Sequence, residues 1–141
     1  MDYDSTPGVL QQYTRVLIKE CLQKSEKIEN CDFIQCFHDR YKCSGDGITE
    51  WAVDLCKAFP VNVIQQFTQQ GQKMMINIQN CTQRFLAQTY RVRNKINCEQ
   101  FERKYFDNMA VCYNQSEFCQ VFKENRQFFM KYSGATIMRQ P

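Results

Sequence analysis

Nine of the 141 residues are cysteines, and this count constrains the fold more than any other feature of the sequence. Thiols stay reduced in the cytosol and form disulfides in oxidising compartments, so a cysteine content this high is typical of secreted domains. The sequence therefore predicts a secreted, extracellular protein that is braced by disulfides. Because eight cysteines alone admit about a hundred pairings, their spacing does not determine which of them pair.

The composition argues against several classes of protein. Hydrophobic residues make up 43% of the chain and charged residues 23%, which is typical of a globular domain. The net charge of +3 is too small to favour nucleic acid, and a single histidine disfavours metal and triad chemistry. No apolar run reaches the ~20 residues of a membrane span. We expect no cofactor, and because Met1–Asp4 lacks the features of a signal peptide, we expect the mature form of a secreted protein.

Apolar residues recur three or four positions apart along most of the chain, which predicts an all-α fold. We expect a single domain over residues 1–141 with six to seven helices, a core from about residue 9 to residue 132, and frayed termini. The expected helices are Val9–Ile28, Asp32–Tyr41, a helix that ends at Phe59, one from Val61, one through Met74 and Phe85, one through Phe101 and Cys112, and Ser116–Tyr132.

Turn-forming residues are expected to separate these helices. Ser44–Gly47 forms a turn, Pro60 a corner and Arg91–Lys95 a connection, while Gly71 separates two helices. We expect Asp32 to cap the second helix and either Asp46 or Thr49 to cap the third. The pattern contains no convincing alternating strand.

The cysteines follow a distinctive order, with one on the first helix and two more at the ends of the run Cys31-Asp32-Phe33-Ile34-Gln35-Cys36. Two sequence blocks accompany them, Asp54-Leu55-Cys56-Lys57-Ala58-Phe59 and Phe67-Thr68-Gln69-Gln70-Gly71-Gln72-Lys73. These blocks and the cysteine intervals, including the later ones, resemble the stanniocalcin family. The resemblance covers roughly residues 16 to 120 and is more specific than a single short motif.

This resemblance implies both a disulfide pairing and a biological role. The implied bridges are Cys21–Cys36, Cys31–Cys56, Cys43–Cys98 and Cys81–Cys112. Stanniocalcins are secreted glycoprotein hormones, usually homodimers, linked to calcium and phosphate balance and to inhibition of pappalysin-type metalloproteinases. The resemblance therefore implies a non-enzymatic, hormone-like protein that binds an extracellular protein partner, and a host-surface or gamete-surface protein is an alternative partner.

Cys119 is left over by the implied pairing. In the family its counterpart pairs with a cysteine further along, which this sequence does not contain. An intermolecular bridge in a homodimer, a partner lost by truncation and a buried free thiol are the three interpretations.

Several surface features are also candidates for function. The triplets Asn80-Cys81-Thr82 and Asn114-Gln115-Ser116 are glycosylation acceptors. A basic patch could bind sulfated glycans, although such a patch is more often only solvated. The residues of this patch are Arg84, Arg91, Arg93 and Lys95.

The final helix carries more apolar surface than one core-facing stripe needs, so part of it could form a homodimer contact. Core packing is the alternative interpretation. The residues of this candidate dimer face are Phe118, Val121, Phe122, Phe128 and Phe129.

Three further functions remain as alternatives. His38 and Asp39 follow Cys36 as in secreted phospholipases A2, but a surface histidine is the favoured interpretation. Ser44–Gly47 with Glu50 could offer oxygens to calcium, although a capped turn fits the residues better. A lipid carrier would line a cavity with the methionines at positions 74, 75 and 109.

Overall fold

The structure is a computed structural model that describes residues 2–4, 11–27, 31–43, 47–115 and 118–138. Within these ranges the chain has seven α-helices and one pair of short strands. In chain order the elements are β1 (Asp2–Asp4), α1 (Gln11–Lys24), α2 (Asp32–Tyr41), α3 (Ile48–Lys57), α4 (Val61–Ile64), α5 (Gln69–Val92), β2 (Lys95–Asn97), α6 (Cys98–Gln115) and α7 (Phe118–Met138). The predicted all-α class with six to seven helices is confirmed.

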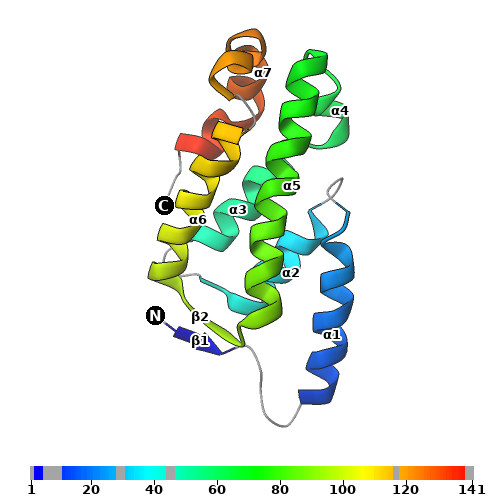
Figure 1. Ribbon diagram of the computed structural model, residues 1–141, viewed down its shortest axis with the longest axis vertical. Coiled ribbons are helices and arrows are strands. Elements are labelled where there is room, and N and C mark those ends of the chain that lie inside the picture. Colours follow the sequence, from blue (N-terminus) through cyan, green and yellow to red (C-terminus); the bar gives the residue numbers. More distant parts are fainter. Residues whose placement is uncertain (1, 5–10, 28–30, 44–46, 116–117, 139–141) are drawn as a thin grey trace.

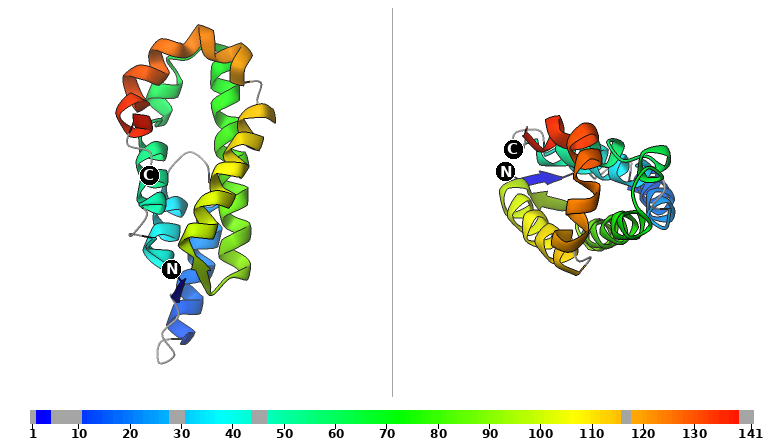
Figure 2. Two further views of the ribbon diagram at one scale, coloured as in Figure 1. Left: turned by 90° about the vertical axis from the view of Figure 1, so that its left-hand side faces the viewer. Right: turned by 90° about the horizontal axis from the view of Figure 1, so that it is seen from above.

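Helix α5 runs along most of the long axis of the molecule, with α6 beside it (Figure 1). Helix α1 and the strand pair lie at one end of this axis, and α4 and α7 lie at the other. Helix α7 crosses from the α5 and α6 side to the α3 side, so that it closes that end of the bundle (Figure 2). The two ends are built around separate groups of buried side chains.

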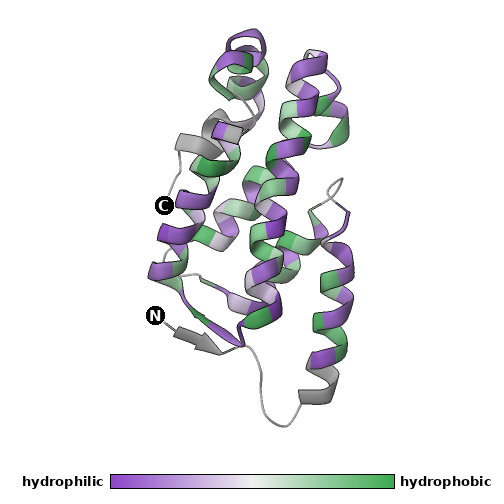
Figure 3. Cartoon of the chain, viewed as in Figure 1, coloured by the Kyte–Doolittle hydropathy of each residue, from purple (hydrophilic) through white to green (hydrophobic). Residues whose placement is uncertain are grey.

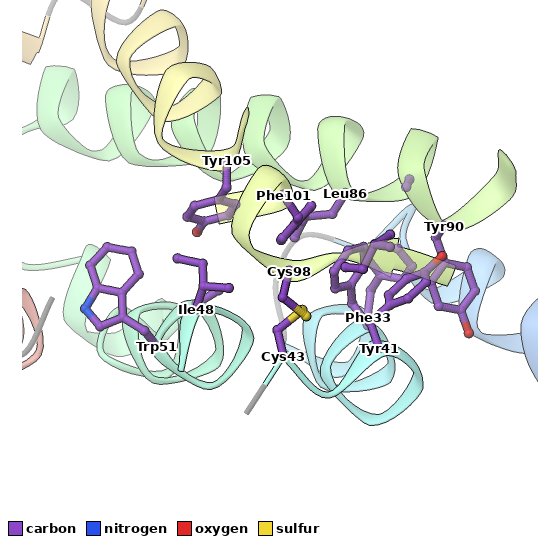
Figure 4. Close-up of a cluster of buried hydrophobic side chains, with 14 residues drawn as sticks. Phe33, Tyr41, Cys43, Ile48, Trp51, Leu86, Tyr90, Cys98, Phe101 and Tyr105 are labelled. Atoms are coloured by element: carbon purple, nitrogen blue, oxygen red, sulfur yellow. A yellow bond between two sulfur atoms is a disulfide. The ribbon is translucent and has the colours of Figure 1, made fainter. Parts of the chain in front are cut away.

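The first core cluster lies between α2 and α3 on one side and α5 and α6 on the other. Figure 4 shows Phe33 and Tyr41 facing Tyr90, with the Cys43–Cys98 disulfide between the two layers. Aromatic rings dominate this cluster, and the Phe33 and Tyr90 rings meet edge to face with centroids 5.4 Å apart. Its buried residues are Phe33, Phe37, Tyr41, Cys43, Ile48, Trp51, Ala52, Leu86, Ala87, Tyr90, Ile96, Cys98, Phe101 and Tyr105.

The second core cluster joins α4, the first half of α5 and α7. Phe67 and Phe129 are both buried in it, with ring centroids 5.3 Å apart. Its buried residues are Phe59, Val63, Ile64, Phe67, Met74, Met75, Ile78, Val121 and Phe129.

The prediction that Gly71 separates two helices is wrong, because α5 runs through it. Helix α5 begins after Thr68, whose side-chain oxygen accepts a hydrogen bond from the Gly71 N–H at 3.1 Å. Gly71 is instead a packing position, since a Cβ atom there would lie 2.5 Å from the Asn125 side chain. Hydrophobic and hydrophilic residues alternate along α5 (Figure 3), which reflects a helix buried along one face.

The predicted caps of α2 and α3 are also corrected. The N-cap of α2 is Cys31, and Asp32 is already helical. The N-cap of α3 is Gly47, with φ of 70°, while Thr49 is buried inside the helix. Asp46 and the rest of the predicted turn at 44–46 lie outside the described residues. Helix α3 ends at Lys57, and Pro60 forms the expected corner as the N-cap of α4.

The first and last helices differ in length from the prediction. Helix α1 ends at Lys24 because Ser25 begins a turn, and the Gln83 amide of α5 donates to the Ser25 carbonyl at 2.6 Å. The predicted start at Val9 and end at Ile28 lie outside the described residues. The final helix continues past Gly134 to Met138, so the prediction of a frayed tail is wrong for this segment.

The two short strands were not predicted. β1 pairs antiparallel with β2, with Asp2 opposite Asn97 and Asp4 opposite Lys95. The predicted connection at Arg91–Lys95 is therefore shorter, because α5 extends to Val92 and β2 begins at Lys95. Buried Ile96 anchors β2 to the first core cluster.

Candidate functional site

Four disulfides join neighbouring elements of the fold. They are Cys21–Cys36, Cys31–Cys56, Cys43–Cys98 and Cys81–Cys112. These are the pairs that the stanniocalcin resemblance implies. Four disulfides are typical of a protein that folds in an oxidising compartment. In the described part of the chain, no helix is long and apolar enough to cross a bilayer.

Cys119 is the free cysteine, and its side chain is exposed near the start of α7. It lines a shallow surface hollow of about 220 Å³ together with Tyr113, Asn114 and Phe118. The interpretation as a buried free thiol is therefore wrong. An exposed thiol on a helix is accessible to a thiol of another chain.

The candidate dimer face is mostly turned toward the protein's own core. Val121 and Phe129 are buried in the second core cluster, which agrees with the core-packing alternative at these two positions. Phe118, Phe122 and Phe128 are half-buried and pack on the same cluster. The apolar excess of this helix is explained by its crossing over the end of the bundle, where it contacts α3, α5 and α6.

Both glycosylation candidates are exposed, although their surroundings differ. Asn80 lies within α5, next to Cys81, which is bridged to Cys112 of α6. Asn114 lies in the last turn of α6, and Ser116 of its triplet is outside the described residues.

The predicted basic patch is divided between a helix surface and a groove. Arg84 and Arg91 are exposed on α5, whereas Arg93 and Lys95 line a groove of about 460 Å³ between α5, β2 and α6. Lys104 of α6 lines the same groove and was missed by the sequence reasoning. The sequence feature that could have identified Lys104 is its position one helical turn after Phe101, which is buried and also lines the groove.

The end of α5 beside this groove is held by a cation and aromatic rings. The Arg40 guanidinium donates to the Tyr90 carbonyl at 2.7 Å and to the Arg93 carbonyl at 2.9 Å. It also lies 4.4 Å from the centre of the Tyr90 ring, a cation–π contact. The Tyr41 hydroxyl donates to the Arg93 carbonyl at 2.7 Å, and burial raises the pKa of Tyr41 to about 12 against the opposing charge of Arg40. The Tyr90 carbonyl in the last turn of α5 and the Arg93 carbonyl just after the helix are thus bonded from within the protein.

The geometry around His38 does not assemble a catalytic pair. His38 Nδ1 lies 2.6 Å from the Thr49 hydroxyl, while the Asp39 carboxylate accepts from the Gln35 amide at 2.9 Å. Adjacent helical residues project about 100° apart, so the two side chains contact different partners. Among the residues that the structure describes, no group of three or more His, Cys, Asp or Glu side chains could hold a metal ion. The candidate calcium turn at 44–46 falls outside those residues.

An apolar cavity lies between α2, α3, α5, α6 and α7, with Met75 and Met109 in its wall. Met74 points into the second core cluster and not into this cavity. The cavity holds about 80 Å³. Pockets that bury whole small molecules hold roughly 300–1,000 Å³, so this space is too small for an acyl chain.

Comparison of the chain with protein-family models, with curated proteins and with solved structures finds no match. The class that the geometry itself defines is an all-α protein with four disulfides and one exposed free cysteine.

Proposed function

We propose that the chain is a secreted, non-enzymatic, hormone-like glycoprotein of the stanniocalcin type that acts by binding an extracellular protein partner. Calcium or phosphate regulation and metalloproteinase inhibition are the roles that the resemblance implies. The observation that carries the proposal is the disulfide pairing. Of the many pairings that nine cysteines allow, the chain has the one implied by the resemblance.

The proposed protein is a homodimer linked through Cys119. Exposure of this thiol supports the link, because a disulfide between chains requires both sulfur atoms to be reached from outside. The hollow formed by Tyr113, Asn114 and Phe118 beside Cys119 supplies a non-covalent contact surface around the bridge.

The first experiment is intact mass with and without reductant, followed by mapping of the disulfide-linked peptides. We expect a covalent dimer whose only intermolecular bridge joins two copies of Cys119. Cys119→Ser should give a monomer mass without reductant, whereas Lys123→Ser, an exposed change one turn later, should leave the dimer intact. A monomeric wild-type protein, or a dimer joined through another cysteine, would contradict the proposed homodimer linked through Cys119.

A second experiment addresses the partner. Inhibition of a pappalysin-type metalloproteinase is measured with the oxidised wild-type protein and with Cys119→Ser. We expect inhibition by the wild-type protein and weaker inhibition by the variant, because a dimer presents two copies of the binding surface. Absence of inhibition would remove the metalloproteinase role and favour a host-surface or gamete-surface partner.

A further inference from the structure

The groove between α5, β2 and α6 brings together cations that are well separated in the sequence. Arg93 follows the end of α5, Lys95 begins β2 and Lys104 lies on α6. All of these side chains are exposed. Among the described residues that line the groove, every charged one is basic. The groove therefore presents a local positive potential, although the protein as a whole carries a net charge of only +3.

The backbone around the groove adds to this potential. Helix α6 begins at Cys98, and the Asn97 side-chain oxygen accepts from the Gln100 N–H at 3.0 Å, so the positive end of an 18-residue helix faces this region. The C-terminal end of α5 carries the opposite dipole, but the Arg40 guanidinium donates to the Tyr90 carbonyl in the last turn of α5 and to the Arg93 carbonyl just after it. An anion in the groove thus meets the helix end that attracts it, while a cation lies at the end of α5.

Neutral side chains of the groove suit a sugar. The amides of Gln88 and Gln100 line it and can donate to or accept from hydroxyl groups. Phe85 is half-buried in the wall and lies nearly parallel to Phe101, with ring planes 13° apart and centroids 6.1 Å apart. An aromatic face of this kind packs against the C–H face of a sugar ring. A volume of about 460 Å³ is enough for a disaccharide-sized unit.

We propose that this groove binds a sulfated polysaccharide, with Arg93, Lys95 and Lys104 pairing with sulfate groups while Gln88, Gln100 and Phe85 contact the sugar rings. Sulfate groups spaced along a sugar chain match cations contributed by three separate elements of the fold. Uncharged hydrogen-bonding groups and an aromatic wall favour a sugar over a simple phosphate chain. Binding of a glycan in this groove requires neither the Cys119 dimer nor the protein partner.

The cations of the groove are exposed. Binding is therefore expected to be strongly salt-dependent, because exposed charges are screened within about 8 Å at physiological ionic strength.

The test is calorimetric titration of the full, oxidised chain with size-defined heparin at about 0.15 M salt. The groove variant is Arg93→Glu/Lys95→Glu/Lys104→Glu. The matched control is Lys57→Glu/Lys73→Glu/Lys123→Glu, which reverses the same number of exposed charges on α3, α5 and α7, outside the groove. Mass and circular dichroism check that each variant keeps its disulfides and its helices.

We expect the groove variant to bind heparin at least about tenfold more weakly than the wild-type protein, and the control to change by less than about threefold. Desulfated heparin should bind at least about tenfold more weakly than heparin. Three results would overturn the proposal: no binding by the wild-type protein, an equal loss in both variants, or equally tight binding of a single-stranded oligonucleotide or a phosphatidylserine vesicle. The last result would assign the groove to another class of polyanion.

Discussion

The two ends of the molecule are held together in different ways. The first core cluster is crossed by the Cys43–Cys98 disulfide and flanked by the bridge between α1 and α2. At the opposite end, α4 contains no cysteine, and the single cysteine of α7, Cys119, is free. The second core cluster includes side chains of α4 and α7. In the described part of the chain, no disulfide attaches either of these helices to the rest of the protein.

A buried polar contact, and not a disulfide, attaches α7 at that end. Asn125 of α7 is fully buried, and its side-chain oxygen accepts from the Thr68 N–H at 2.8 Å. Its amide donates to the Thr68 hydroxyl and to the Val121 carbonyl, both at 3.1 Å. The two bonds to Thr68 join α7 to the start of α5 across 57 residues of sequence, whereas the bond to Val121 lies within α7. They also rely on Gly71, because a Cβ atom there would overlap the Asn125 side chain.

The end of the molecule that contains α7 should open before the end that contains the Cys43–Cys98 bridge. A disulfide restrains the unfolded chain as well as the folded one, whereas a hydrogen bond is lost as soon as the segment separates. Opening of α7 breaks no covalent bond, while separation of α2 from α6 is limited by the Cys43–Cys98 bridge. We expect amide hydrogens of α7 to exchange faster than those of α2, since local opening requires less free energy there.

Removal of the Cys43–Cys98 bridge should destabilise the protein most. Cys43→Ala/Cys98→Ala should lower the free energy of unfolding by about 4 kcal/mol, because the chain-entropy contribution grows with loop length and these residues are 55 apart. Removal of Cys21–Cys36, which are 15 apart, should cost about 3 kcal/mol. Urea unfolding of the two variants checks the order, and the reverse order would contradict this account.

The next largest effect should come from the polar contact of the second cluster. Asn125→Ala removes three hydrogen bonds and leaves the Thr68 N–H without its acceptor. We expect a loss of about 2–3 kcal/mol in the free energy of unfolding, measured in urea. Exposed Gln127→Ala on the same helix is the control and should change it by less than about 0.5 kcal/mol. An equal loss in both variants would mean that Asn125 is not the fastening residue.

Gly71→Ala should change the free energy of unfolding by less than Asn125→Ala does. The sign of the change shows whether helix propensity or the overlap with Asn125 dominates. In an open helix this change stabilises by about 1 kcal/mol, because alanine is the better helix former. Here the added Cβ meets Asn125 atoms at 2.5–2.6 Å, so we expect a loss of about 1–2 kcal/mol.

The clash is tested in a double-mutant cycle with Asn125→Ala. In that background Gly71→Ala should cost less than it does alone, because the overlapping side chain has been shortened. Full additivity of the two changes would show that the two positions are not coupled.

A pH dependence of the first core cluster is also expected. Burial raises the pKa of Tyr41 to about 12 from 10.0, so the folded state holds this proton where the unfolded state has lost it. The resulting stabilisation is complete below pH 10 and is lost as the pH rises through about 12. Burial also raises the pKa of Tyr105, so Tyr41→Phe should flatten the alkaline loss of stability without abolishing it. Urea unfolding between pH 9 and pH 12 gives the free energy of unfolding as a function of pH. If this free energy falls with pH as steeply in Tyr41→Phe as in the wild-type protein, the assignment to Tyr41 is contradicted.

Much of the helical framework could be predicted because its signals are local. The span of α2 agrees with the prediction at both ends, since apolar spacing and the flanking cysteines mark it. Gly71 was misread for the opposite reason. Its role depends on Asn125, which is far away in the sequence, and a glycine in isolation is typical of a helix break. A signal was present, since Asn125 falls at helical spacing between Val121 and Phe129, a polar residue on an apolar face.

The candidate groove was predictable only in part. Arg93 and Lys95 are close in sequence and were singled out, but Lys104 joins them only because α6 turns back beside α5. The sequence alone allows the apolar residues of α7 either to pack in the core or to form a dimer contact. Which face of the helix is covered depends on the direction in which it crosses the bundle, and local spacing does not contain that direction.

Apolar periodicity and cysteine content are sufficient to predict the all-α class and the disulfide-bonded character of this protein, because they act locally or through composition. Helix packing sets three further features: Asn125 fastens α7 against Gly71, Cys119 is exposed, and Lys104 completes a basic groove. Each of these depends on a contact, or on the lack of one, between segments far apart in the chain. Such contacts are set by how the helices pack, and residue spacing alone does not specify that packing.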